Sequence, residues 1–153
     1  MTAIDPRATQ YLKEFGANQV PMIGYCDPEV VELTASRCEI RIPLQDKTKN
    51  HLNSMYFGAL AVGADVAGGL MAMQMIQASG QPIDLVFKDF KANFLRRPDA
   101  DVHFNCEDGE LVQAMIAKAM QSGERVNETV TVTATADGEP VAEMQLTLSL
   151  KKR

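Results

Sequence analysis

The C-terminal third of the chain carries the clearest alternation of hydrophobic and polar positions. Apolar residues occupy every second position over 126–136, with Glu128 as the one exception, and again over 142–150, and Asp137-Gly138 lies between the two runs. A period of two is typical of a strand with one buried face. Asp-Gly is a frequent two-residue hairpin turn. This pattern predicts an antiparallel hairpin.

Shorter runs predict three further strands. One begins near Cys38, and Pro43 indicates either its end or an edge position. A second covers Val102–Cys106, and the longest covers Ile83–Arg96. In the longest run the apolar residues change parity near Lys88. A change of parity within one strand indicates a β-bulge.

A long helix is predicted over Met55–Ala78, where almost every side is apolar despite four glycines. The glycines are Gly58, Gly63, Gly68 and Gly69. A helix that is apolar all round belongs at the centre of a fold. Because an internal glycine costs about 1 kcal/mol relative to alanine, we expect these glycines to permit close packing. Asn53 or Ser54 is the expected N-cap.

Two shorter helices complete the pattern. The first is expected over Pro6–Phe15, with Asp5 as N-cap and Gly16 at its end, and the second over Glu110–Gln121 on the surface. The order of elements predicts an α+β architecture, in which an antiparallel sheet wraps around one long central helix. We expect a single domain over 1–153, with 1–28 forming an N-terminal helix and loop.

Composition narrows the functional classes. The chain has 153 residues and a net charge of -5, which disfavours nucleic acid as a partner. Three widely spaced cysteines without a CxxC motif indicate neither a disulfide framework nor a zinc site. His51 and His103 lack the spacing of metal ligands. We therefore expect no metal and no cofactor.

The apolar segment Met55–Ile76 also has the composition of a membrane span. It contains Asp65, however, and a central Asp costs about 2.5–3.5 kcal/mol on insertion scales. A buried core helix fits better, and we expect no membrane partner. The first residues include Asp5 and Arg7 and have no apolar signal core, so the expected location is cytoplasmic.

Asp65 is the first candidate for chemistry, because it is the only formally charged residue between Asn50 and Ile83. Burial raises the pKa of a carboxyl group and brings it closer to the strength of a useful general base. The alternative is a structural Asp65 that caps a loop or pairs with Lys88 or His51. The residues alone leave both interpretations open.

The start of the long helix is the second candidate. N–H groups around Tyr56–Gly58 carry the positive end of the helix dipole and could hold an oxyanion. In the alternative interpretation, Asn53 and Ser54 simply satisfy these donors. Together with Asp65, the helix would offer an electrophilic end and a carboxylate.

The stretch Asn50–Leu60 reads Asn-His-Leu-Asn-Ser-Met-Tyr-Phe-Gly-Ala-Leu, and Asp65 follows it. With the later Lys88–Pro98, it resembles the hotdog acyl-CoA thioesterases of the phenylacetyl-CoA thioesterase type. In that family an Asn, a turn often written His-Gly-Gly, and a helical Asp or Glu occur at this spacing. The amino-acid pattern of Asn50–Leu60 is more similar still to a poorly characterised branch of thioesterases. In order of elements the resemblance extends over Arg41–Leu150.

The resemblance implies a role for each residue. Asp65 would activate water or attack the thioester, and Asn50 would orient water or substrate. The N–H of Phe57 or Gly58 would form the oxyanion site, next to Tyr56 in the sequence. In the family these groups meet across a subunit interface. The expected assembly is therefore a homodimer or a dimer of dimers, with acyl-CoA as the small-molecule substrate.

Four basic residues are candidates for contact with the phosphates of CoA. They are Lys88, Lys91, Arg96 and Arg97. The alternative is a solvated strand face, which is the commoner role for any one such residue.

Two departures from the family pattern define a second functional hypothesis. Tyr56-Phe57 replaces the His-Gly of the turn, and Phe87 stands where the family often has Ser or Thr. These residues favour a noncatalytic acyl-CoA or acyl-lipid binding protein. Asp65 and Asn50 favour the first hypothesis, an acyl-CoA thioesterase.

Overall fold

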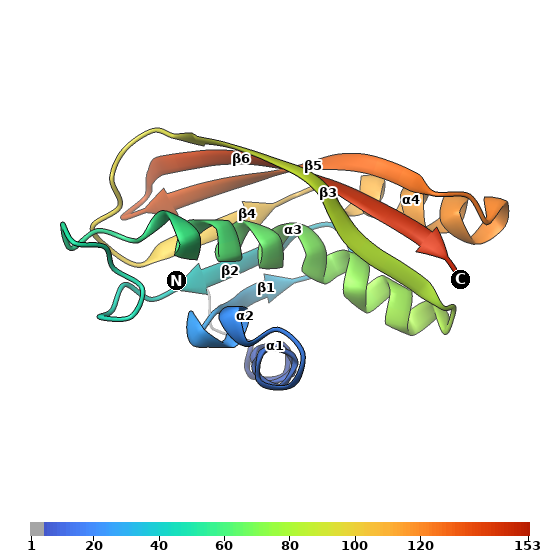
Figure 1. The fold of residues 1–153 in the computed structure, drawn as a ribbon, viewed down its shortest axis with the longest axis horizontal. Coiled ribbons are helices and arrows are strands. Elements are labelled where there is room, and N and C mark those ends of the chain that lie inside the picture. Colours follow the sequence, from blue (N-terminus) through green and yellow to red (C-terminus); the bar gives the residue numbers. More distant parts are fainter. Residues whose placement is uncertain (1–4) are drawn as a thin grey trace.

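The computed structural model describes residues 5–153 and shows a curved antiparallel sheet around a central helix (Figure 1). The helices are α1 (Pro6–Asn18), α2 (Pro21–Tyr25), α3 (Phe57–Ser79) and α4 (Gly109–Ser122). The strands are β1 (Glu29–Leu33), β2 (Cys38–Ile42), β3 (Ile83–Phe94), β4 (Val102–Cys106), β5 (Val126–Ala136) and β6 (Glu139–Lys152). The predicted α+β architecture, with a sheet wrapped around a long helix, is confirmed.

The six strands lie in the order β1-β2-β4-β5-β6-β3. The predicted hairpin is the β5–β6 pair, and both residues of its turn have positive φ, with 50° at Asp137 and 76° at Gly138. Side chains on the inner face of both strands are buried, as Val130 and Leu146 illustrate. The alternation in the sequence therefore marked the face that packs against the helix.

Close contact between α3 and the sheet explains two of the helix glycines. A Cβ atom on Gly63 would lie 2.2 Å from the ring of Phe104, and one on Gly68 would lie 3.3 Å from Val130. In the described residues α3 is the one helix apolar and long enough to cross a membrane, yet 67% of its most apolar window is buried in protein. This helix is the core of the fold, as predicted.

The expected cap of the central helix was wrong. The N-cap of α3 is Tyr56, which makes no side-chain capping bond. Asn53 lies earlier in the loop with a φ of 63°, and Ser54 is buried there. Both groups belong to a tight loop that closes on Asn50 before the helix begins, so neither can reach its first N–H groups.

The N-terminal region also differs from the prediction. The Asp5 side chain caps α1 as expected, but α1 continues to Asn18 through Gly16. A Cβ atom on Gly16 would lie 2.6 Å from the Cα atom of Gly24, in the short helix α2, which the sequence indicated as a loop. Gly16 therefore serves the close packing of α1 on α2 rather than the end of a helix.

The strand β3 lies at one edge of the sheet and pairs with β6. Its register shifts between Phe87 and Asp89, which confirms the predicted bulge near Lys88. The strand carries three exposed apolar side chains, which are Val86 at 55%, Phe90 at 45% and Phe94 at 56%. Proteins normally cover or charge a sheet edge of this kind, because it can pair with another chain.

Candidate active site

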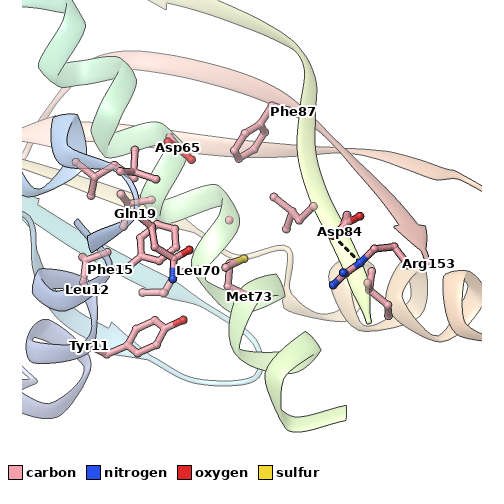
Figure 2. Close-up of a pocket in the computed structure, with 16 residues that line it drawn as sticks. Tyr11, Leu12, Phe15, Gln19, Asp65, Leu70, Met73, Asp84, Phe87 and Arg153 are labelled. Carbon is pink, nitrogen blue, oxygen red and sulfur yellow. Dashed lines mark ion pairs between the residues drawn. The ribbon is translucent and has the colours of Figure 1, made fainter. Parts of the chain in front are cut away.

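Asp65 lies in the middle of α3 and lines a cavity of about 520 Å³ between α1, α3 and β3. Figure 2 shows its carboxylate at the upper end of that cavity. Within residues 5–153 its half-buried side chain has neither a hydrogen bond nor an ion pair. Burial raises the pKa of the Asp65 carboxyl to about 6. An acid of this kind is ionised at neutral pH and can still accept a proton.

The two suggested structural partners of Asp65 lie elsewhere. The ammonium group of Lys88 is 3.7 Å from the carboxylate of Asp89. His51 lines a different cavity, at the start of α3. A structural role for Asp65 as a paired charge therefore has no support in the geometry.

An apolar wall lies beside Asp65. One helical turn later stands Gly69, where a Cβ atom would be 3.9 Å from the Asp65 Oδ1 and 3.3 Å from the ring of Phe87. The β3 strand thus directs an aromatic ring, not a hydroxyl, toward the helix at this point. Phe87 forms an apolar wall for the carboxylate and has no group that could orient water.

A second cavity, of about 420 Å³, lies at the start of α3. The structure brings five of the predicted site residues together around it. They are Asn50, Tyr56, Phe57, Arg96 and Arg97. Gly58 follows next on the helix, and the loop, the helix start and the end of β3 meet here.

The side chain of Asn50 is held in one orientation by its own loop. Its Oδ1 accepts from the backbone N–H of Leu52 at 2.9 Å and of Ser54 at 3.2 Å, and from the Ser54 hydroxyl at 3.3 Å. Because the oxygen is committed to the loop, the amide Nδ2 remains as a donor, and it has no partner among the described residues. Asn50 is therefore a fixed donor beside the second cavity.

The first N–H groups of α3 are also available as donors. The N–H of Met55 donates to the Pro98 carbonyl at 2.8 Å, and the N–H of Tyr56 donates to the Thr48 carbonyl at 2.8 Å. The N–H groups of Phe57 and Gly58 have no acceptor within residues 5–153. Two adjacent free donors at a helix N-terminus are suited to a developing negative charge.

The two cavities are separate within one chain. Asp65 comes eight residues after Phe57, which corresponds to about 12 Å along a helix. The cavities share no lining residue among those described. The sequence predicted that the Asp65 carboxylate and the free N–H donors serve one site. Within one chain they are separated by the N-terminal part of α3.

The predicted basic group is divided in the same way. Arg96 and Arg97 line the second cavity, whereas Lys88 and Lys91 line neither cavity. Lys91 lies opposite Gln145 in the strand pairing, and Lys88 sits at the bulge. The geometry therefore separates two arginines near the candidate site from two lysines on the strand.

One side of the Asp65 cavity was missed by the sequence analysis. Tyr11, Phe15 and Gln19, from α1 and its C-cap, line the cavity opposite β3 (Figure 2). The apolar spacing of Leu12 and Phe15 in a short helix could have indicated a packed face. Nothing in the sequence shows that this face packs beside Asp65.

Comparison with known proteins places the chain in a family. A family model described as "Domain of unknown function (DUF4442)" matches residues 8–150, and the chain belongs to this family. Among curated proteins, no match was found.

Solved structures of similar fold include a thioesterase from Haemophilus influenzae, with 15% identity, a TM-score of 0.72, and coverage of 99% of this chain and 96% of that one. A variant of a thioesterase from Pseudomonas aeruginosa has 16% identity and a TM-score of 0.72, covering 95% and 94%. A Chlorobaculum tepidum protein of unknown function has 13% identity and a TM-score of 0.84, covering 99% of both chains. The chain therefore has the hotdog fold, as the resemblance implied.

Proposed function

We propose that this protein is an acyl-CoA thioesterase, which hydrolyses an acyl thioester to a free acid and CoA. The observation that carries the proposal is the Asp65 carboxylate, which is held without a partner in an apolar cavity and has a pKa raised to about 6. Withdrawing an unpaired carboxylate partly from water costs stability, and functional sites are where such costs are commonly found.

The chemistry requires a base, an orienting donor and an oxyanion site. Asp65 accepts a proton from water, and the water oxygen forms a bond to the thioester carbonyl carbon. The Asn50 amide orients the carbonyl or the water, and the N–H groups of Phe57 and Gly58 stabilise the oxyanion. The carbon–sulfur bond then breaks, and the departing thiolate takes the proton from Asp65.

A second copy of the chain completes the proposed site. The apolar edge of β3 can pair with the same edge of another copy about a two-fold axis. With the axis near Phe90, position 84 of one copy lies roughly opposite position 96 of the other. Asp84 lines the Asp65 cavity and Arg96 lines the second cavity, so this pairing brings unlike cavities together. We therefore propose a homodimer, alone or within a dimer of dimers.

The CoA moiety is assigned to the second cavity. Arg96 and Arg97 are exposed beside the helix start, where guanidinium groups can bind phosphate oxygens in pairs. We place the reaction in the cytoplasm. The three free, buried cysteines, Cys26, Cys38 and Cys106, agree with a reducing compartment.

One observation favours the alternative, a noncatalytic acyl-CoA or acyl-lipid binding protein. Phe87 closes over Gly69 beside Asp65, where a water-orienting hydroxyl would assist hydrolysis. Such a site could hold an acyl group without cleaving it. The two functions differ in whether thiol is released.

The test is thiol release from short, medium, long and aromatic acyl-CoAs by the wild type and by Asp65→Asn. We expect release by the wild type and a loss of about 10²–10⁴-fold in the variant, with the dimer intact. The matched control is Asp137→Asn, which makes the same chemical change at a turn that accepts Asn.

Undiminished turnover by Asp65→Asn would contradict the catalytic assignment. No release by the wild type from any substrate would overturn the proposed function and favour the binding protein. A copurifying acyl ligand, detected by mass spectrometry, would then support that alternative.

A further inference from the structure

The face of α3 that borders the Asp65 cavity has a regular arrangement. Asp65, Gly69 and Met73 follow one another at intervals of four residues, so they lie on the same side of the helix. The middle position has no side chain. The helix therefore presents a carboxylate, then an open stretch, then a flexible thioether.

The cavity has apolar walls on both sides of this helix face. Figure 2 shows Leu12 and Phe15 of α1 on one side of α3 and Phe87 of β3 on the other. The strand runs back along the helix, since Phe87 lies beside Gly69 and Ile83 lines the far part near the helix C-terminus. The walls are thus continuous from Asp65 toward the end of α3.

The far end of the cavity is marked by a change from apolar to charged groups. Asp84 and Arg153 line it and form an ion pair of 3.1 Å, in which both side chains are well exposed. Beyond Met73 the helix face is no longer part of the cavity. The apolar lining therefore extends from Asp65 to about Met73 and stops at the Asp84–Arg153 pair.

The length of this lining can be compared with an acyl chain. Eight residues of helix, from Asp65 to Met73, span about 12 Å. A fully extended polypeptide spans about 3.3–3.6 Å per residue, and each residue contributes three backbone bonds. An extended acyl chain therefore spans roughly 1.2 Å per bond. About ten bonds fit along the cavity, whose volume of about 520 Å³ lies within the range of small-molecule sites.

We infer that the Asp65 cavity is the acyl pocket and that it selects unbranched acyl groups of about ten carbons, with α1 as one wall and with the apolar lining ending at Met73. This inference rests on the proposed function for the identity of the ligand. An aromatic acyl group would fill only the part near Gly69, and a much longer chain would have to pass the charged pair at the far end.

The test measures binding without hydrolysis. Thioether analogues of acyl-CoA with four to sixteen carbons cannot be cleaved, and their dissociation constants can be measured by calorimetry on the wild-type protein. We expect affinity to increase about fourfold with each added methylene, as burial of apolar surface requires, up to about ten carbons. It should then stay level or fall.

Two variants test which residues set the chain length at which affinity stops rising. Met73→Trp fills the far end of the apolar lining and should move the break in the series to a chain at least two carbons shorter. Gly69→Ala, which also favours the helix, places a methyl group 3.3 Å from the Phe87 ring and should weaken binding of the ten-carbon analogue about tenfold. Met22→Trp is the control, because Met22 is 71% exposed and lies outside the cavity.

Affinity that rises steadily to sixteen carbons, or that ignores chain length, would overturn the inference. The same applies if Met73→Trp and Gly69→Ala bind every analogue as the wild type does. A break near ten carbons in a protein that releases no thiol would leave the pocket assignment standing and reject the thioesterase.

Discussion

The cavity beside Asp65 and the cavity at the start of α3 are lined by opposite kinds of chemical group. The first combines one raised-pKa carboxylate with apolar walls. The second combines free N–H groups, the fixed amide of Asn50 and two arginines, without an acidic residue in its lining. In the proposed function, the first supplies a base and room for an acyl chain, and the second supplies donors for an oxyanion and for phosphates. Each would then be half of a thioesterase site that is completed across two subunits.

The pH dependence of hydrolysis should show the largest effect, because it depends on the base in the first cavity alone. With a pKa of about 6 for Asp65, kcat/KM should be constant above about pH 7 and fall about tenfold per pH unit below 6. Near pH 4 roughly 1% of the activity should remain. Initial rates of thiol release measure this profile, and circular dichroism checks that the fold persists. A flat profile through pH 6 would remove Asp65 as the base.

The role of the Asn50 amide donor in the second cavity can be tested separately with Asn50→Asp. This variant keeps an oxygen for the loop N–H groups of Leu52 and Ser54 but loses the free amide donor. We expect turnover to fall about 10–100-fold, with little change in melting temperature. Asn50→Ala should lose stability as well, because it removes the loop acceptor. If Asn50→Asp turns over as fast as the wild type, the amide has no role in the reaction.

Stability should distinguish a catalytic Asp65 from a structural one. The pKa of Asp65 is about 6 in the folded protein and near 3.8 when unfolded, so the folded state binds more protons between these values. Stability is therefore lost as the pH rises from about 4 to 6. Asp65→Asn should be more stable than the wild type by roughly 1–2 kcal/mol at pH 7.5, and about equal to it below pH 4.

Urea unfolding at the two pH values measures this difference. A variant that is less stable than the wild type at pH 7.5 would show that Asp65 makes a favourable structural contact. The control is again Asp137→Asn, which should change stability little at either pH.

The smallest expected effect concerns the phosphate contacts. Replacing both Arg96 and Arg97 by Gln should raise KM for acyl-CoA about 3–10-fold and leave kcat nearly unchanged. Acyl-pantetheine substrates lack the nucleotide phosphates, so their KM should not change. Lys91→Gln should have less effect on either substrate, because Lys91 lines neither cavity. Equal losses for acyl-CoA and acyl-pantetheine would contradict the phosphate assignment.

Local patterns were sufficient to predict the elements that depend on local rules. The β5–β6 hairpin follows from alternation and an Asp-Gly turn, and α3 follows from a stretch without a polar face. Asp65 was identified because a lone charge in an apolar helix requires an explanation. The glycine contact between Gly63 and Phe104 was foreseen only as a need for close packing.

Features that depend on distant contacts could not be predicted in this way. Gly16 resembled a helix terminator, but its role depends on Gly24 in a helix that the sequence did not reveal. Phe15 and Asp65 line the same cavity although they are some fifty positions apart in the sequence. The loop that closes on Asn50 uses Ser54, which looked like a helix cap. In each case, tertiary packing decided between two roles that the local sequence allows.

The central claim, a site shared by two subunits, is tested most directly by combining two variants of low activity. Asp65→Asn and Asn50→Asp are coexpressed with different affinity tags, and thiol release is measured on the mixed dimers and on each variant alone. A mixed dimer has one site with an intact Asp65 from one subunit and an intact Asn50 from the other. If half of the dimers are mixed, the unseparated mixture should recover about a quarter of wild-type turnover. Activity no higher than that of the separate variants would contradict the shared site and place both groups of a functional site in one chain.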